Sequence, residues 1–207
     1  MYTLYFAPGT CALASHIALA EAGADYELKR LDFSKSEQRT PDYLAVNPKG
    51  RVPALVTPQG TLTETPAILV YVAQTYPEAN LAPLDNAFAF ARLQSFNSFL
   101  CSTLHINHAH GRRGARWADD EAAIESMKKK TPETVLASFE MVENGMLAGP
   151  WVMGDDYTIA DIYLFTVAQW IEPNGIDPAR LPRVAEHRRR MMDRPAVAKA
   201  VAEEKAG

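Results

Sequence analysis

The hydrophobic pattern of the first forty residues changes from a strand period to a helix period and back. Residues 2–6 (YTLYF) are mostly aromatic or β-branched and are followed by a Pro-Gly pair, which predicts a strand. Residues 11–23 are rich in alanine and leucine and stop at a glycine, which predicts a helix. Polar and apolar residues then alternate over 26–33, which indicates a second strand.

The next forty residues predict a hairpin followed by a helix. Residues 52–57 and 61–64 flank a Pro-Gln-Gly turn and have the composition of two paired strands. Residues 65–77 predict a helix with Thr65 as its N-cap and a proline at the first helical position, where the missing N–H is tolerated. With a short helix expected in 40–47, the order of elements is βαβαββα.

From about residue 85 onward only helical periods occur. They predict a long helix over 86–110, a second over 119–147, a third over 158–172, and two shorter ones within 181–205, separated at Pro195. We therefore expect an α/β domain over 1–78, a linker over 79–86 and an all-helical domain over 87–207. Both domains have ordinary sizes.

The composition excludes several functional classes. Apolar residues make up 47% of the 207 residues and charged residues 22%, which is the balance of a globular protein. The net charge of −4 offers no basis for a nucleic-acid surface. No apolar run approaches the roughly 20 residues that span a bilayer, and the first residues lack the pattern of a signal peptide. Two distant cysteines make no disulfide framework, so a reducing cytoplasm is expected.

Cys11 stands where the first predicted strand gives way to a predicted helix. A thiol at a helix N-terminus lies among unpaired N–H groups and the positive end of the helix dipole, which lowers its pKa from about 8.5. Ala12, Leu13 and Ala14 follow, so no CxxC motif is present and a dithiol cycle within the chain is disfavoured. A reactive thiol and a small buried hydrophobic residue both fit the local sequence.

Two other clusters have structural explanations. Thr158 and Asp161 predict a capping box at a helix start, which is a folding signal, and we assign it no catalytic role. Cys101, His105 and His108 share one face of the long predicted helix with a spacing that zinc can accept. A buried cysteine and histidines near a helix C-terminus explain this pattern better, so no metal is predicted.

Four segments, in this order and spacing, resemble a bacterial beta-class glutathione S-transferase. They are PGTCALASHIALAEAG (8–23), VNPKGRVPALV (46–56), LTETPAILVYVA (62–73) and GDDYTIADIYLF (154–165). The resemblance runs across nearly the whole chain. It implies the glutathione S-transferase fold, with a thioredoxin-like domain built on a four-stranded mixed sheet and an all-α second domain. It also implies a homodimer, while the composition gives no reason to expect a nucleic-acid or membrane partner in the cytoplasm.

The resemblance further implies where glutathione binds. Cys11 matches the cysteine near the glutathione sulfur, and Val52, before an expected cis-Pro53, would pair its backbone with the cysteinyl part of the ligand. Glu64 and Thr65 match the pair that holds the γ-glutamyl end. The Glu64 carboxylate suits the ligand's ammonium, while the Thr65 hydroxyl and the N–H groups at a helix start suit its carboxylate.

Three more positions are implied to contact glutathione. Lys35 matches a lysine near the glycyl carboxylate. His105 matches a histidine that faces the sulfur from the second domain, and with Cys11 it forms the implied catalytic pair. Ser98 stands where some members carry an asparagine on the long helix.

The chain also departs from the family pattern. Phe6 aligns with a frequent tyrosine, and Tyr5, one place earlier, should point to the opposite face of its strand. Thr103 stands where some members have a glutamate. The segment HINHAHGRRGARW (105–117) differs from the better-known members and falls where the electrophile site is expected, so substrate preference is the least transferable property.

The implied reaction is attack of the glutathione thiolate on a hydrophobic electrophile, with glutathione as co-substrate and no metal. Cys11 would also allow thiol–disulfide exchange or peroxide reduction with glutathione. Two alternatives use the same fold: a glutathione-dependent lyase, isomerase or dehalogenase, and a noncatalytic binding protein.

Overall fold

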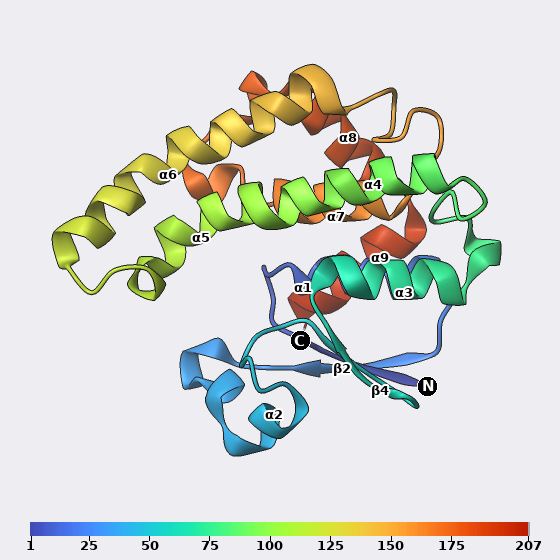
Figure 1. The fold of residues 1–207 in the computed structure, drawn as a ribbon, viewed down its shortest axis with the longest axis horizontal. Coiled ribbons are helices and arrows are strands. Elements are labelled where there is room, and N and C mark those ends of the chain that lie inside the picture. Colours follow the sequence, from blue (N-terminus) through green and yellow to red (C-terminus); the bar gives the residue numbers. More distant parts are fainter. Residues whose placement is uncertain (207) are drawn as a thin grey trace. The chain divides into compact units, whose positions relative to one another are not determined.

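In a computed structural model of the chain, residues 1–206 are described, and they divide into two compact units (Figure 1). The first unit comprises residues 1–90 together with the chain from Met191 onward, and the second comprises residues 91–190. The domain limits 1–78 and 87–207 stay a prediction.

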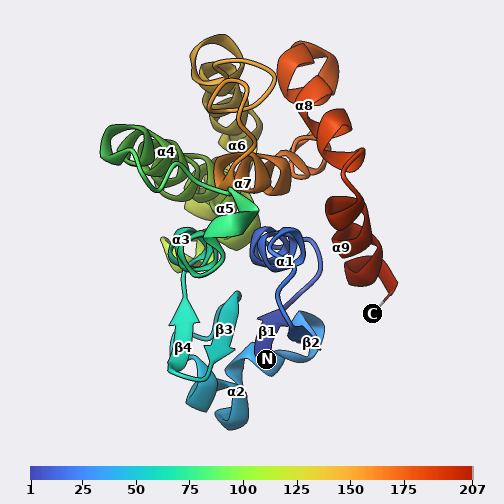
Figure 2. The same ribbon diagram turned by 90° about the vertical axis from the view of Figure 1, so that its right-hand side faces the viewer.

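The first unit contains a four-stranded mixed sheet with the strand order β2-β1-β3-β4 (Figure 2). The strands are β1 (Tyr2–Phe6), β2 (Tyr26–Arg30), β3 (Ala54–Thr57) and β4 (Gly60–Thr63). β1 pairs in parallel with β2 and antiparallel with β3, and β3 pairs antiparallel with β4. The predicted mixed sheet is confirmed.

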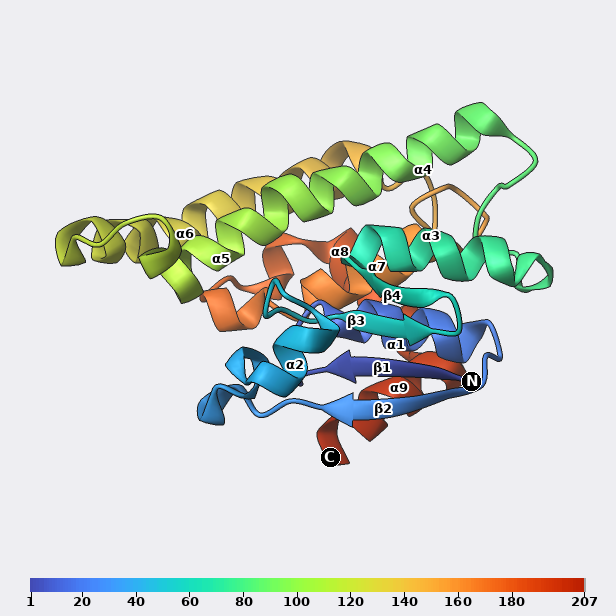
Figure 3. The same cartoon turned by 60° about the horizontal axis from the view of Figure 1, so that its bottom comes forward.

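Helices cover both faces of this sheet. They are α1 (Ala12–Glu21), α2 (Pro41–Val46) and α3 (Thr65–Thr75), while α9 (Pro195–Ala206) packs against α1. Figures 2 and 3 show α1 and α3 on one face and α2 on the other. The predicted order βαβαββα is confirmed, with short 3-10 turns added at Phe33–Lys35, Glu37–Arg39 and Pro77–Ala79.

The alternation of β1 decides which side chains enter the core. Tyr2, Leu4 and Phe6 are buried, whereas Tyr5 is half-buried and packs on Tyr43 of α2, with 5.4 Å between ring centroids. Period-2 geometry places residues i and i+1 of a strand on opposite faces. The expectation that Tyr5 faces away from Phe6 is therefore confirmed.

A cluster of ionisable side chains joins α9 to α1. His16 of α1 is fully buried, and its Nε2 lies 3.0 Å from Glu203 Oε2, while its Nδ1 lies 3.6 Å from Glu204 Oε1. Burial raises the pKa of Glu204, and the hydrogen bond and charge of His16 oppose that rise. Beside this cluster, the guanidinium of Arg194 donates to Glu21, with an Nε to Oε1 distance of 2.6 Å. The C-terminal helix is thus fastened to the helix that begins beside Cys11.

The regular secondary structure of the second unit is helical. Its elements are α4 (Ala87–Phe99, which begins in the first unit), α5 (His105–Arg113), α6 (Glu121–Met141), α7 (Ile159–Ala168) and α8 (Pro182–Met192), with π-helical turns at Leu100–Leu104 and Val142–Met146 and 3-10 turns at Gly114–Arg116, Glu172–Asn174 and Pro178–Arg180. All ten residues of α7 are buried, as expected for a helix that is apolar on every side. Among the helices of the described residues, none combines the length and apolarity needed to span a bilayer.

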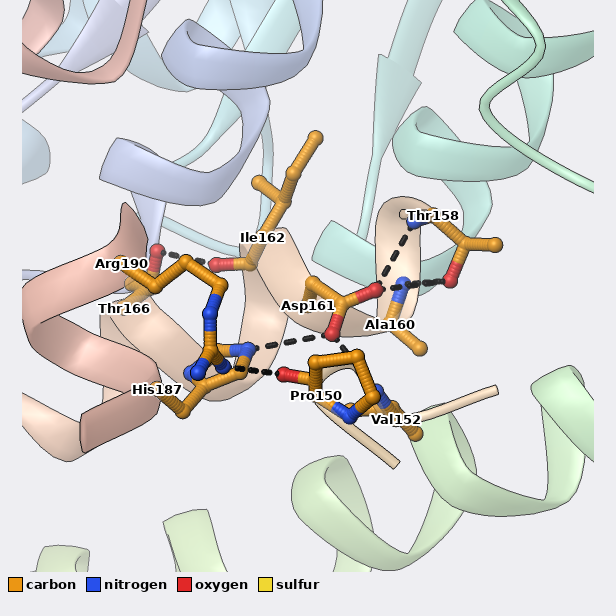
Figure 4. Close-up of polar contacts among 9 residues, drawn as sticks. All are labelled: Pro150, Val152, Thr158, Ala160, Asp161, Ile162, Thr166, His187 and Arg190. Carbon is orange, nitrogen blue, oxygen red and sulfur yellow. Dashed lines mark hydrogen bonds and ion pairs between the residues drawn. The ribbon is translucent and has the colours of Figure 1, made fainter. Parts of the chain in front are cut away.

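The predicted capping box at the start of α7 is confirmed, and it is larger than the sequence motif (Figure 4). The Ala160 N–H donates to Thr158 Oγ1 at 3.3 Å, and the Thr158 N–H donates to Asp161 Oδ2 at 2.8 Å. The other oxygen, Asp161 Oδ1, accepts the Val152 N–H at 2.7 Å and lies 3.0 Å from His187 Nε2. One buried carboxylate therefore joins α7, the preceding loop and α8.

The prediction that Thr65 is an N-cap is wrong. Thr65 is the first residue of α3, and the N-cap is Glu64, with φ 71° and ψ 118°. The chain turns from β4 into α3 at Glu64, through a left-handed backbone conformation that a non-glycine residue rarely adopts. The helix therefore begins one residue earlier than the Thr-Pro pair indicates.

Candidate functional site

The sheet topology brings Cys11 next to Val52. Because β1 and β3 are antiparallel, with Tyr5 opposite Ala54, the C-terminal end of β1 and the N-terminal end of β3 lie at the same end of the sheet. Here the Cys11 Sγ lies 3.7 Å from the Val52 carbonyl oxygen, and the thiol donates to it. Cys11 is the N-cap residue of α1 and is 8% exposed. The Val52–Pro53 peptide bond is cis, as the resemblance implied.

Two buried side chains hold the backbone that leads to Val52. The Tyr43 hydroxyl donates to the Arg51 carbonyl oxygen at 2.6 Å, and Asn47 Nδ2 donates to the same oxygen at 2.7 Å. Burial raises the pKa of Tyr43, so the hydroxyl keeps the proton that it donates. The sequence reasoning missed both residues. Asn47 lies inside the VNPKG motif that could have indicated it, whereas Tyr43 carries no such signal.

Glu64 and Thr65 lie where β4 gives way to α3. Thr65 is buried, and the Glu64 side chain is 55% exposed. Glu64 Oε1 accepts a hydrogen bond from Lys49 Nζ at 2.6 Å, and the same Nζ lies 2.9 Å from Thr63 Oγ1. Lys49 lies within the family segment 46–56, although the sequence does not predict it as a site residue.

Lys35 has a different neighbour. It lies on the exposed 3-10 turn Phe33–Lys35, and its Nζ is 3.4 Å from Asp32 Oδ2. Hydrogen bonds from Ser34, followed by the charge of Lys35, lower the pKa of the Asp32 carboxyl. The structure pairs the Lys35 ammonium with Asp32, and its place near the glycyl carboxylate of glutathione stays a prediction.

Ser98 and His105 belong to the second unit. Ser98 is exposed on α4, and its carbonyl oxygen accepts a hydrogen bond from the Ser102 hydroxyl at 2.8 Å. His105 is half-buried at the start of α5, with its ring centroid 4.9 Å from that of Trp170. The π-helical turn Leu100–Leu104 interrupts the α-helical spacing between Cys101 and the histidines. Residues 1–206 contain no group of three side chains placed to hold a metal ion.

His108 is part of the core of the second unit. Its ring stacks on Trp170 at 4.3 Å and 11°, and its Nδ1 lies 2.9 Å from Asn174 Nδ2. Burial lowers its pKa to about 4, the hydrogen bond to Asn174 opposes this, and the charges of Arg112 and Arg113 add to the lowering. His108 is therefore neutral at neutral pH and serves packing.

We expect His108 to make the second unit sensitive to acid. The pKa of His108 is about 4 in the folded chain and ordinarily 6.5, so as the pH falls the unfolded chain takes up the proton before the folded chain does. The contribution of neutral His108 to the free energy of unfolding is fully present above pH 6.5 and falls by about 3 kcal/mol by pH 4. Urea unfolding of the wild type and of His108→Gln, followed by tryptophan fluorescence between pH 4 and 7.5, measures the difference in slope. His110→Gln, a half-buried histidine on the same helix, is the control. Parallel profiles for wild type and His108→Gln would contradict the prediction.

Comparisons with known proteins identify the family of the chain. Residues 1–74 match the glutathione S-transferase N-terminal domain, and residues 100–195 match the glutathione S-transferase C-terminal domain. Glutathione S-transferase GstA of Escherichia coli O157:H7 is 33% identical over 97% of this chain and 98% of its own.

Solved structures show the same similarity. A glutathione transferase homolog from Sulfitobacter, crystallised with bound glutathione, has a TM-score of 0.95 and 44% identity, covering 100% of this chain and 98% of its own. A bacterial beta class glutathione S-transferase from Sphingomonas chungbukensis has a TM-score of 0.85 and 35% identity, covering 98% of each chain. The chain therefore belongs to the glutathione S-transferase family.

Proposed function

We propose that the protein is a glutathione transferase that promotes attack of the glutathione thiolate on a hydrophobic electrophile. The observation that carries the proposal is the Cys11 thiol at 3.7 Å from the Val52 carbonyl, beside cis-Pro53. An extended peptide can pair with an exposed backbone edge in the manner of an added strand. The cysteinyl N–H of glutathione would take the Val52 carbonyl as its acceptor, which brings the ligand's sulfur to the N-terminus of α1.

The ends of glutathione would bind on either side of this point. Glu64 takes the γ-glutamyl ammonium, Thr65 and the first N–H groups of α3 take its carboxylate, and Lys35 takes the glycyl carboxylate. The family membership of the chain and the glutathione-bound Sulfitobacter relative support this assignment.

The catalytic effect would come from holding and ionising the ligand's thiol. The N-terminus of α1 favours a thiolate over a thiol, and His105 supplies a further hydrogen-bond donor. Holding the thiolate against the electrophile removes the entropic cost of their encounter. No metal is needed for this step, because the nucleophile arrives with the co-substrate.

The proposal includes the organisation of the whole protein. Residues 1–78 would bind glutathione, residues 79–86 would form the linker, and residues 87–207 would carry the electrophile site. Ser98 and His105 of the helical part would contribute further contacts to glutathione. The protein would act as a homodimer in the cytoplasm, without nucleic-acid or membrane partners.

Binding to immobilised glutathione tests the proposal directly. The wild type should be retained and should elute with dissolved glutathione, and a panel of electrophiles, disulfides and peroxides should then identify the reaction. Glu64→Gln should weaken retention by about tenfold, since the charge-assisted contact with the ammonium is lost. Glu27→Gln, on the exposed end of β2, is the matched control. A wild-type protein that passes through the column would favour a noncatalytic role.

A further inference from the structure

Lys49 occupies the contact on Glu64 that the proposed function reserves for an ammonium group of the ligand. Its Nζ lies 2.6 Å from Glu64 Oε1. We propose that Lys49 is the second charged residue of the γ-glutamyl subsite. When the ligand's ammonium binds Glu64, the Lys49 ammonium leaves Glu64 and pairs with the ligand's α-carboxylate. This inference rests on the proposed function and names the chemical class that the subsite selects, a zwitterionic amino-acid end.

The backbone of Lys49 is held by hydrogen bonds to the buried residue Asn47. Its N–H donates to Asn47 Oδ1 at 3.1 Å, and the Gly50 N–H donates to the Asn47 carbonyl oxygen at 2.9 Å. Gly50 has φ 59°, and a Cβ at this position would lie 2.9 Å from the Gln38 carbonyl oxygen. The turn is therefore closely constrained, while the Lys49 side chain is 48% exposed and its ammonium is accessible to a ligand.

The backbone of Glu64 is also held in an unusual conformation. Its φ of 71° is left-handed, which costs energy in a non-glycine residue and persists only where the surroundings impose it. Within the described chain, the Glu64 side chain makes no capping hydrogen bond to α3, although the residue is the N-cap. The carboxylate is directed to the Lys49 ammonium instead of being used by the helix.

Exchange of ion pairs would favour a ligand that carries both an ammonium and a carboxylate on its α-carbon. A ligand that carries only an ammonium must displace Lys49 from Glu64, so one pair breaks and one forms. A ligand that also carries a carboxylate on the same carbon offers Lys49 a new partner, so one pair breaks and two form. Both side chains are about half exposed, so each pair contributes modestly, and the difference acts mainly on selectivity.

The test compares two ligands that differ by one carboxylate. Calorimetric titrations use glutathione and 4-aminobutyryl-cysteinyl-glycine, which lacks the α-carboxylate, with wild type, Lys49→Met and Lys49→Arg. Lys49→Met should weaken the affinity for glutathione by about fivefold, which is the scale of one exposed ion pair. The same variant should bind the decarboxylated analogue as tightly as the wild type or more tightly, and Lys49→Arg should restore glutathione binding.

Lys29→Met provides the control, because Lys29 has a similar exposure and lies 3.6 Å from the Glu27 carboxylate. It should leave both affinities unchanged. The inference is overturned if Lys49→Met keeps full affinity for glutathione, or if it weakens both ligands by the same factor. A wild type that binds no glutathione would instead overturn the proposed function, so the two failures are distinguishable.

Discussion

Replacing Cys11 with alanine should lower the rate of glutathione-dependent disulfide exchange by at least about 100-fold. It should leave the rate of conjugation within about tenfold of the wild type. In exchange, the Cys11 thiolate attacks the glutathione sulfur of a mixed disulfide, forms a new disulfide with it and releases the substrate thiolate. A second glutathione thiolate then attacks that disulfide. Oxidised glutathione leaves, and the Cys11 thiolate is regenerated.

The two reactions differ in which molecule supplies the sulfur nucleophile. In conjugation the reacting sulfur belongs to glutathione, and the N-terminus of α1 and the Val52 backbone remain in Cys11→Ala. In exchange, Cys11 itself forms a covalent bond, and no CxxC neighbour can replace it.

The measurement pairs a chloronitroaromatic conjugation assay with reduction of a glutathione mixed disulfide. Cys101→Ala is the matched control, because Cys101 is a half-buried cysteine of the second unit. Collapse of conjugation together with intact disulfide reduction would show that the two roles are divided wrongly.

Asp161→Ala should lower the free energy of unfolding of the second unit by about 3–5 kcal/mol. The Asp161 carboxylate is fully buried and accepts hydrogen bonds from the Val152 and Thr158 N–H groups, while its Oδ1 lies 3.0 Å from His187 Nε2 (Figure 4). Alanine leaves these donors buried without an acceptor, and each such group costs about 1–3 kcal/mol.

Urea unfolding at pH 7 measures this effect. The three tryptophans of the chain all lie in the second unit, and Trp151 packs 5.8 Å from His187, so fluorescence reports on the region concerned. Asp156→Ala, at an exposed position in the same loop, should change stability by less than about 0.5 kcal/mol. Asp161→Asn keeps one acceptor and the side-chain volume, and should lie between wild type and Asp161→Ala. Equal stability of Asp161→Ala and Asp156→Ala would contradict the prediction.

The sequence by itself determined what depends on local periods and spacings. The order βαβαββα followed from changes in hydrophobic period, and the capping box followed from two residues three positions apart. The four family segments then indicated the fold and the residues of the glutathione site. A π-helical turn escaped detection because one extra residue in a long helix barely alters its hydrophobic pattern.

Only the tertiary structure decided which distant charges meet. Lys49 and Glu64 are 15 residues apart, Asp161 and His187 are 26 apart, and His16 and Glu203 are 187 apart. Their contacts depend on how the chain returns after each strand and helix, which no local period encodes. The turn from β4 into α3 likewise imposes a left-handed backbone at Glu64. This conformation determines where α3 begins, and the Glu64 carboxylate faces Lys49.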